Sequence, residues 1–383
     1  MQGEVMMDKA KIEKYLDLVT DRLINLQRPD GEEEMLKRQK ETNQIIGAFP
    51  RDFGMEPWDW PQGVGLYGMW KRFGNYRNEA ISDYLNQWFS RHLGEDIPKQ
   101  NINTTCPLLT LAELTEKNPA YEKLCNDWAR WIMEELPRTE ENGFQHTTTK
   151  DASKGTLNMN ENQMWIDTLF MTVLFLAKWG IKTGNQAYME EAVHQYLMMI
   201  KYLYERETRL FYHAWDFTDR SNFGKVFWCR GNSWYTASVL DFVEIMGDNL
   251  GQAVKEILLD TFRAQASALK ALQSKNGLWH TVLDDAGSYE ETSGSAAITY
   301  GILKGIRLGI LGDDYKDTVN RAIEGILGNI REDGTVMNVS AGTPVGKDRD
   351  HYKNIFIAPM AYGQSLCMMA LTEALLADSG ENI

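Results

Sequence analysis

Cysteine is scarce in this sequence of 383 residues, and none of its cysteines forms a CxxC pair. Their spacing matches no zinc-binding pattern, so we expect neither a disulfide framework nor a metal site. Scattered thiols in a long chain are typical of a reducing compartment, which favours a cytoplasmic location. The four cysteines are Cys106, Cys125, Cys229 and Cys367.

Long apolar runs are also missing. The longest apolar stretch, residues 164–179, is interrupted by Asp167 and Lys178 and is too short to cross a bilayer. Residues 1–26 have no basic segment followed by an apolar one, and they are typical of an amphipathic helix. We therefore expect neither a signal peptide nor a membrane span.

Positive charge is in deficit. The chain has 40 Lys and Arg against 54 Asp and Glu, a net charge of −14. Nucleic-acid binding and charge-driven attachment to anionic lipid both need basic surfaces, so neither partner is expected. Aromatic residues make up 11% of the chain, including 12 Trp, which suits both sugar stacking and a large core.

Two kinds of helix alternate along the sequence. Some segments have apolar residues at i, i+3, i+4 and i+7 with a charged opposite face, which predicts one-sided helices: 187–205, 254–272 and 315–330. Others are apolar nearly all round and predict buried helices: 165–179, 234–246, 295–310 and 360–377. Gly180 and Gly247 are placed to end two of the buried helices. Strand signals are weak, with short hairpin pieces expected at 277–285 and 334–342.

The alternation is a repeat of about 60 residues, longer than the repeats of short solenoids. Each buried helix follows a turn rich in aromatic and polar residues, and these turns start near Trp58, Thr104, Trp165, Trp228, Glu290 and Phe356. Six such units suffice to close a ring. We therefore predict an all-α fold, an (α/α)6 barrel that forms one catalytic domain over residues 1–383. The six turns would meet at one mouth, where a ligand binds.

Asp167 is the first candidate at this mouth, because it stands alone among apolar residues at a helix start. It could act as a general acid and base, or it could simply cap its own helix. Apolar neighbours would raise its pKa and the helix dipole would lower it, so the net direction stays open. His146 precedes the same helix and either contacts the substrate or makes one structural hydrogen bond.

Three tryptophans, Trp60, Trp165 and Trp234, belong to three different turns. Aimed at one mouth, they would serve as platforms for sugar rings, although a lone Trp at a helix start is usually core. Arg230 lies one helical turn before Trp234. Its guanidinium could bind a uronate carboxylate in a fork, or it could bridge helix ends.

A series of motifs follows the aromatic turns along the chain: WDWPQGV at 58–64, GFQHTT at 143–148, NENQMWIDTLFM at 160–171, FYHAWD at 211–216, FWCRGNSWYTAS at 227–238, GLWHTVLDD at 277–285 and YEETSGSAA at 289–297. In these motifs and in their order, the sequence resembles the unsaturated uronyl hydrolases of glycoside hydrolase families 88 and 105. It is closer to family 105, the unsaturated rhamnogalacturonyl hydrolases of pectin breakdown. The resemblance covers essentially the whole chain.

The resemblance implies an activity without a cofactor: removal of a 4,5-unsaturated uronic acid from a small oligosaccharide by hydration of its double bond. It implies that Asp167 is catalytic and that His146 and His213 contact the substrate. Some members carry a second Asp in the second turn, where this chain has NINTTCPLL at 101–109. There, Asn103, Thr104 or Thr105 could bind a sugar hydroxyl, but none of them could replace an acid.

Three other functions remain open from the residues alone. A conventional inverting glycosidase needs two acids, and Asp167 could pair with Asp59 or Glu291. A sugar epimerase would use two histidines, for which His146 and His213 are a conceivable pair. A sugar-binding barrel without activity is the third possibility, because fold alone does not fix function.

Overall fold

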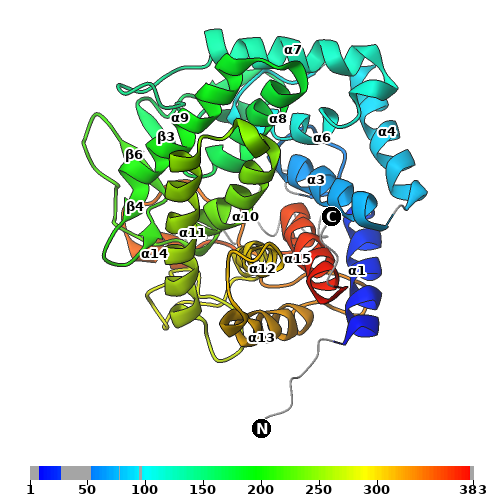
Figure 1. Ribbon diagram of the computed structural model, residues 1–383, viewed down its shortest axis with the longest axis vertical. Helices are drawn as coiled ribbons and strands as arrows, with labels where there is room; N and C mark the ends of the chain where they lie inside the picture. The colour runs from blue at the N-terminus through cyan, green and yellow to red at the C-terminus, as the bar shows by residue number, and fades with distance from the viewer. Residues whose placement is uncertain (1–7, 27–52, 77, 95–96, 380–383) are drawn as a thin grey trace.

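The computed structural model describes residues 8–26, 53–76, 78–94 and 97–379 (Figure 1). Its longer helices are α1 (Lys9–Ile24), α3 (Trp60–Tyr76), α4 (Glu79–Leu93), α7 (Pro119–Glu134), α8 (Leu174–Thr183), α9 (Gln186–Leu203), α10 (Cys229–Met246), α11 (Gln252–Leu272), α12 (Thr292–Arg307), α13 (Lys316–Leu327) and α15 (Ala361–Ser379). Shorter helical segments are α5 (Ile102–Thr105), α6 (Leu108–Leu111), the π-helical turn η3 (Leu169–Val173) and α14 (Arg349–Lys353).

The helices form two concentric rings, which confirms the predicted (α/α)6 barrel (Figure 1). Within the described residues, the inner ring runs through α3, α5 with α6, η3 with α8, α10, α12 and α15, and it closes where α15 packs on α3. Each inner segment packs against an outer helix adjacent in sequence, except that α15 takes α1 from the other end of the chain. The two ends of the described chain therefore form one pair of an inner and an outer helix.

The two helix types predicted from the sequence take up these two positions. Outer helix α13 buries one stripe of side chains at helical spacing: Thr318, Val319, Ala322, Ile323, Ile326 and Leu327. Inner helix α10 is buried on almost every side, from Cys229 to Phe242. Burial of apolar surface from both kinds of helix against each other supplies the main driving force for the barrel.

One predicted helix end and one predicted helix start were wrong. Gly180 lies inside α8, and the helix ends instead at Gly184, which has the left-handed φ of 66° that favours glycine. A Cβ on Gly180 would lie 2.9 Å from Met189 Cγ, so this glycine allows α8 and α9 to pack closely. The helix expected from residue 165 begins only after it, because Gln163–Trp165 forms a strand. Gly247 does end α10, as predicted.

The described residues include six short strands in the connections between helices: β1 (Thr148–Asp151), β2 (Thr156–Asn158), β3 (Gln163–Trp165), β4 (Tyr204–Glu205), β5 (Leu210–Phe211) and β6 (Ala214–Asp216). They pair antiparallel as β1 with β2, β3 with β6 and β4 with β5. The pieces expected at 277–285 and 334–342 form only isolated bridges, such as Trp228 with Val282 and Ser340 with Ile357.

A cluster of charged residues occupies the far end of the inner ring. Asp241 on α10 contacts Lys304 on α12 and lies 3.0 Å from Lys71 on α3, and its carboxylate also accepts from Tyr67 and Tyr300 at 2.8 Å. Burial opposes ionisation of Asp241, but Lys304 and Lys71 hold its pKa well below the usual range. At 1.5 Å per residue, Asp241 lies about 18 Å along α10 from Cys229 at the mouth.

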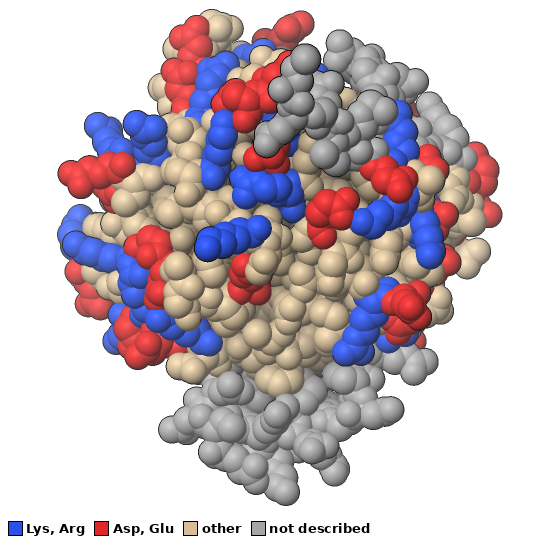
Figure 2. Space-filling view, turned by 90° about the horizontal axis from the view of Figure 1, so that it is seen from below, with Lys and Arg blue, Asp and Glu red and all other residues tan. Residues whose placement is uncertain are grey.

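The surface carries both signs of charge. On the face shown in Figure 2, basic and acidic side chains lie intermixed and do not gather into a patch of one sign. No helix in the described part of the chain is both long and apolar enough to cross a membrane.

Candidate active site

Backbone hydrogen bonds bring three distant segments together at the mouth. Strand β3 pairs with β6, and just beyond it the N–H of Ile166 donates to the carbonyl of His213 at 3.0 Å. On the other side, the N–H of His146 donates to the carbonyl of Gln163 at 2.9 Å. The short strands therefore place His146 and His213 on either side of the segment that carries Asp167.

The aromatic rings of these segments pack on each other. The imidazole of His146 stacks on the indole of Trp165, with centroids 4.4 Å apart and an interplanar angle of 7°. The ring of His213 meets Trp165 edge-on at 5.4 Å. One face of Trp165 is thus taken by His146, so a sugar can reach this indole only at its edge or opposite face.

Asp167 lies at the centre of the group, directly before the π-helical turn η3. Its Oδ2 is 3.2 Å from Nε2 of His213. Neither atom has a hydrogen-bond partner of normal geometry among the described residues, and their close contact with each other lies outside ideal hydrogen-bond geometry. The Asp167 side chain is 17% exposed and that of His213 only 2%. Because Oδ2 is buried, solvent reaches Asp167 from its other side.

The helix cap considered for Asp167 does not fit this geometry, because the buried oxygen faces an imidazole rather than a backbone N–H. Burial alone would raise the pKa of Asp167, but the close contact with His213 outweighs it and holds that pKa below its usual value, with smaller contributions from His146 and Arg230. The sequence left open whether the pKa of Asp167 is raised by apolar neighbours or lowered by the helix dipole. In the structure the pKa is lowered, and the cause is a histidine rather than the helix dipole.

His146 is a buried neutral base. Burial lowers its pKa to about 4, and the attraction of Asp167 only partly offsets this effect. Its Nδ1 lies 2.9 Å from the hydroxyl of Thr168, the residue after Asp167. His146 is therefore uncharged at neutral pH and anchored to the start of the inner helix.

Two further aromatic residues contact His213, and neither was predicted from the sequence as a site residue. The ring of Trp228 lies 4.3 Å from the His213 ring, and the hydroxyl of Tyr352 lies 3.0 Å from His213 Nδ1. Trp228 stood at a predicted turn, which was the available signal. Tyr352 lies in a segment without helical periodicity, so nothing in the sequence placed it here.

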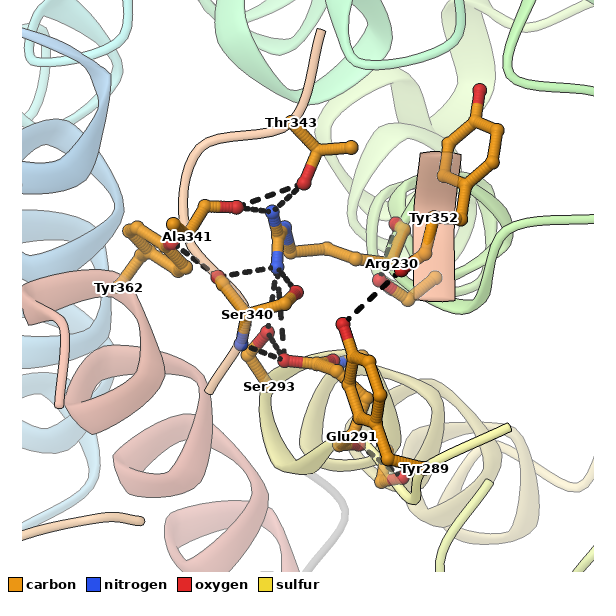
Figure 3. A network of polar contacts seen from close by, with 12 residues as sticks. Arg230, Tyr289, Glu291, Ser293, Ser340, Ala341, Thr343, Tyr352 and Tyr362 are labelled. Atoms are coloured by element: carbon orange, nitrogen blue, oxygen red, sulfur yellow. Dashed lines mark hydrogen bonds and ion pairs between the residues drawn. The ribbon is translucent and has the colours of Figure 1, made fainter. Parts of the chain in front are cut away.

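Arg230 is fully buried and tied to the loop that follows Val339 (Figure 3). Its Nη1 donates to the carbonyl of Ser340 at 2.9 Å, and its Nη2 donates to the carbonyl of Ala341 at 2.7 Å and to Thr343 Oγ1 at 3.1 Å. The guanidinium also lies 4.6 Å from the ring centre of Trp228. Arg230 thus has the bridging role considered above, and a fork to a uronate stays a prediction, because a carboxylate would compete with these acceptors.

Glu291 belongs to the same network and is fully buried (Figure 3). Its carboxylate accepts from Ser293 Oγ at 2.7 Å, from the N–H of Gly294 at 2.6 Å and from the N–H of Ser340 at 2.9 Å. It therefore caps α12 and holds a loop. These bonds occupy both oxygens, which argues against Glu291 as the second acid of an inverting glycosidase. Asp59, the other candidate, is buried and accepts from the N–H of Trp60 at 2.8 Å.

The other two tryptophans predicted as platforms differ in burial. Trp234 is fully buried, with its ring 5.3 Å from that of Phe170 and 6.2 Å from that of Trp60. The expectation that Trp234 stacks on a sugar does not fit this burial, because packed side chains cover the ring. Trp60 retains 7% exposure beside Tyr362 and stays a candidate contact.

The two candidate residues of the second turn, Thr104 and Asn103, have different roles. Thr104 completes a capping box with Asn101: its hydroxyl accepts from the N–H of Asn101 at 3.0 Å, while the Asn101 side chain accepts from the N–H of Thr104 at 3.1 Å. This hydroxyl therefore serves the start of α5 rather than a sugar. Asn103, on the same turn, keeps 7% exposure and stays a candidate.

Comparisons with known proteins agree with one another. Residues 32–377 match the model of Glycosyl Hydrolase Family 88. The unsaturated rhamnogalacturonyl hydrolase YesR of Bacillus subtilis is 31% identical over 88% of this chain and 95% of its own length. An unsaturated 3S-rhamnoglycuronyl hydrolase of Formosa agariphila is 26% identical over 84% of this chain and 86% of its own. A crystal structure of a possible GH105 member from Salmonella enterica superposes with a TM-score of 0.87 at 35% identity, covering 98% of this chain and 96% of that one.

Proposed function

The chain belongs to glycosyl hydrolase family 88, and we propose that it removes the 4,5-unsaturated uronic acid from the non-reducing end of oligosaccharides that polysaccharide lyases release. It is a glycoside hydrolase of the unsaturated rhamnogalacturonyl type. The observation that carries the proposal is Asp167, a partly exposed carboxylate in contact with a buried histidine.

The chemistry needs only one such carboxylate. The double bond between C4 and C5 of the substrate is part of an enol ether, which accepts a proton far more readily than an ordinary acetal. Protonated Asp167 gives its proton to C4, and positive charge develops on C5, where the ring oxygen stabilises it. Because the resting pKa of Asp167 is low, the uronate carboxylate of the bound substrate assists this step: a nearby like charge raises the pKa of an acid.

The second half of the reaction uses the same group as a base. Ionised Asp167 takes a proton from water while the water oxygen bonds to C5, which restores the acid. The resulting hemiketal opens by breaking the bond between C5 and the ring oxygen. That leaves a hemiacetal at C1, which collapses to an aldehyde and releases the next sugar with its glycosidic oxygen. The net reaction consumes one water.

The other candidates bind and orient the substrate in this scheme. His146 is neutral at working pH, so it offers hydrogen bonding rather than charge. Trp165 and Trp60 provide apolar surface for the sugar rings, and Asn103 offers an amide to a hydroxyl. Arg230 contributes positive charge near Asp167 while holding the loop at Ser340.

We propose the unsaturated rhamnogalacturonan disaccharide as the substrate. The relative named an unsaturated rhamnogalacturonyl hydrolase matches over nearly its whole length, at a higher identity than the one named for a 3S-rhamnoglycuronyl substrate. Rhamnose follows the uronic acid in this assignment.

The geometry gives less support to the other functions. Both oxygens of Glu291 are taken up in capping α12 and holding a loop, so an inverting pair would have to rely on Asp59. An epimerase would need His146 and His213 on opposite sides of a sugar carbon, but both imidazoles pack against the indole of Trp165.

A panel of disaccharides tests the proposal. Purified enzyme is incubated with lyase-generated unsaturated disaccharides and with the saturated counterpart. Loss of ultraviolet absorbance from the double bond is followed for the unsaturated compounds, and the released sugar is quantified for all of them. Turnover is expected for the rhamnose-containing product and not for the same disaccharide with a saturated uronate. Equal turnover of the saturated compound would contradict the proposal.

We further propose that the enzyme works in the cytoplasm as one catalytic domain. All four cysteines are free and buried, which suits a reducing compartment. Helices from both ends of the chain, α1 and α15, pack together in the rings, which supports one domain.

A further inference from the structure

Tyr352 reaches the catalytic group from a part of the chain that is far away in sequence. It lies on the short helix α14, in the connection between α13 and α15, and its hydroxyl lies 3.0 Å from His213 Nδ1. We propose that Tyr352 is a positioning residue that fixes the proton of His213 on Nε2, where it faces Asp167. This inference rests on the proposed role of Asp167.

The hydrogen bonds around Tyr352 determine to which partner its hydroxyl donates its proton. The N–H of Gly346 donates to the Tyr352 oxygen at 3.1 Å, so this oxygen already acts as an acceptor. A phenol has one proton to give. Among the described residues, the acceptor that lies within reach of that proton is Nδ1 of His213. When the phenol donates to Nδ1, the proton of a neutral imidazole must be on Nε2.

The position of this proton decides how His213 meets Asp167. With the proton on Nε2, the ring presents a donor to Asp167 Oδ2 across 3.2 Å. With the proton on Nδ1, it would present a lone pair to a carboxylate, which is repulsive. The first arrangement holds one oxygen of Asp167 in place and leaves the exposed side of the carboxylate for the substrate.

The surroundings hold Tyr352 firmly enough for this role. Its side chain is 1% exposed and packs with Val226, Trp228 and Val282 in a small cluster of its own. Burial raises the pKa of Tyr352, so the phenol keeps its proton over the working range. The two ends of α14 are anchored by ion pairs, Arg349 with Asp284 and Lys353 with Asp285.

The chain offers a matched control on the same segment. The hydroxyl of Tyr289 donates to the backbone carbonyl of Tyr352 at 3.4 Å (Figure 3). Tyr289→Phe therefore removes one hydroxyl bonded to this segment without touching His213. Tyr352→Phe removes one hydroxyl that does touch His213. Any general loosening of the segment would appear in both variants.

The test combines nuclear magnetic resonance with kinetics. Enzyme labelled with nitrogen-15 in its six histidines is compared with a His213→Gln variant to assign the His213 signals. We expect Nδ1 of His213 to be unprotonated in the wild type and in Tyr289→Phe, and partly protonated in Tyr352→Phe. We expect kcat of Tyr352→Phe to fall by about 10- to 100-fold, the size typical of losing a group that orients a histidine, with KM changed less than about twofold.

Two results would overturn the inference. One is a protonated Nδ1 in the wild-type enzyme. The other is a Tyr352→Phe variant whose His213 tautomer and kcat both match those of Tyr289→Phe. The resonance measurement needs no substrate. A failure of the enzyme on unsaturated uronides would therefore leave the tautomer result intact, and the two proposals can fail separately.

Discussion

The imidazole of His146 lies flat against the indole of Trp165, with 4.4 Å between the ring centres and 7° between the planes. This contact removes His146 from water and keeps it neutral. The consequence is a titration linked to folding, since a histidine in the unfolded chain has a pKa of about 6.5.

The first prediction is therefore a loss of stability in acid. The folded pKa of His146 is about 4, so between pH 6.5 and pH 4 the unfolded chain binds the proton more tightly. Stability from this group is complete above pH 6.5 and falls as the pH drops toward 4, by up to about 3 kcal/mol. Denaturant unfolding at several pH values measures it. His146→Gln should show a correspondingly flatter pH dependence, and an identical dependence would contradict the assignment.

The second prediction concerns Asp167→Asn. The amide keeps the shape of the side chain but cannot transfer a proton, so kcat should fall by at least about 10²–10⁴-fold while the fold survives. Initial rates on an unsaturated disaccharide and thermal unfolding are measured together. Glu161→Gln, an exposed acid six residues away, is the control and should keep its rate. If Asp167→Asn kept over half the wild-type rate, Asp167 would not be the acid.

The third prediction concerns the charge cluster at the far end of the barrel. Asp241→Asn leaves the buried amine of Lys304 with much less compensating charge, which should cost about 3–5 kcal/mol of unfolding free energy. The rate per folded molecule should stay the same, because the cluster is about 18 Å from the mouth along α10. Asp260→Asn breaks an exposed pair with Arg263 and should change stability little. If Asp241→Asn lowered the catalytic rate and left the stability unchanged, the cluster would be linked to catalysis instead.

The fourth prediction separates core from site at Trp234. Its complete burial means that Trp234→Ala opens a cavity beside Phe170 and should cost about 3–5 kcal/mol of stability. KM for the unsaturated disaccharide should change little below the melting temperature of the variant. The opposite outcome, an unchanged melting temperature with a large rise in KM, would restore Trp234 as a sugar platform.

Much of the fold could be predicted because it depends on local periodicity. The apolar stripe of α13 and the apolar sequence of α10 each specify which ring the helix joins. Gly180 was misread because a glycine that ends a helix and a glycine that lets two helices touch look alike in sequence. Strand β3 is only three residues long, too short for its alternation to stand out.

The site was predictable where chemistry and motif coincided, and unpredictable where it depended on long-range contacts. Asp167 stands out as an acid in an apolar stretch. The bridging of Arg230 depends on carbonyls at Ser340 and Ala341, more than a hundred positions later, and backbone acceptors leave no mark in the sequence. Tyr352 meets His213 across 139 positions, for the same reason.

The most direct test of hydration at C4 and C5 is the stereochemistry of the proton added to C4. The reaction is run in deuterium oxide, and the uronate product is examined by proton magnetic resonance within the first turnovers, before solvent exchange at C4. If Asp167 delivers the proton to one face of the double bond, deuterium will occupy a single C4 position. Deuterium spread equally over both C4 positions would mean that the enzyme cuts at C1 and that the released enol picks up its proton from solvent, which would contradict the mechanism.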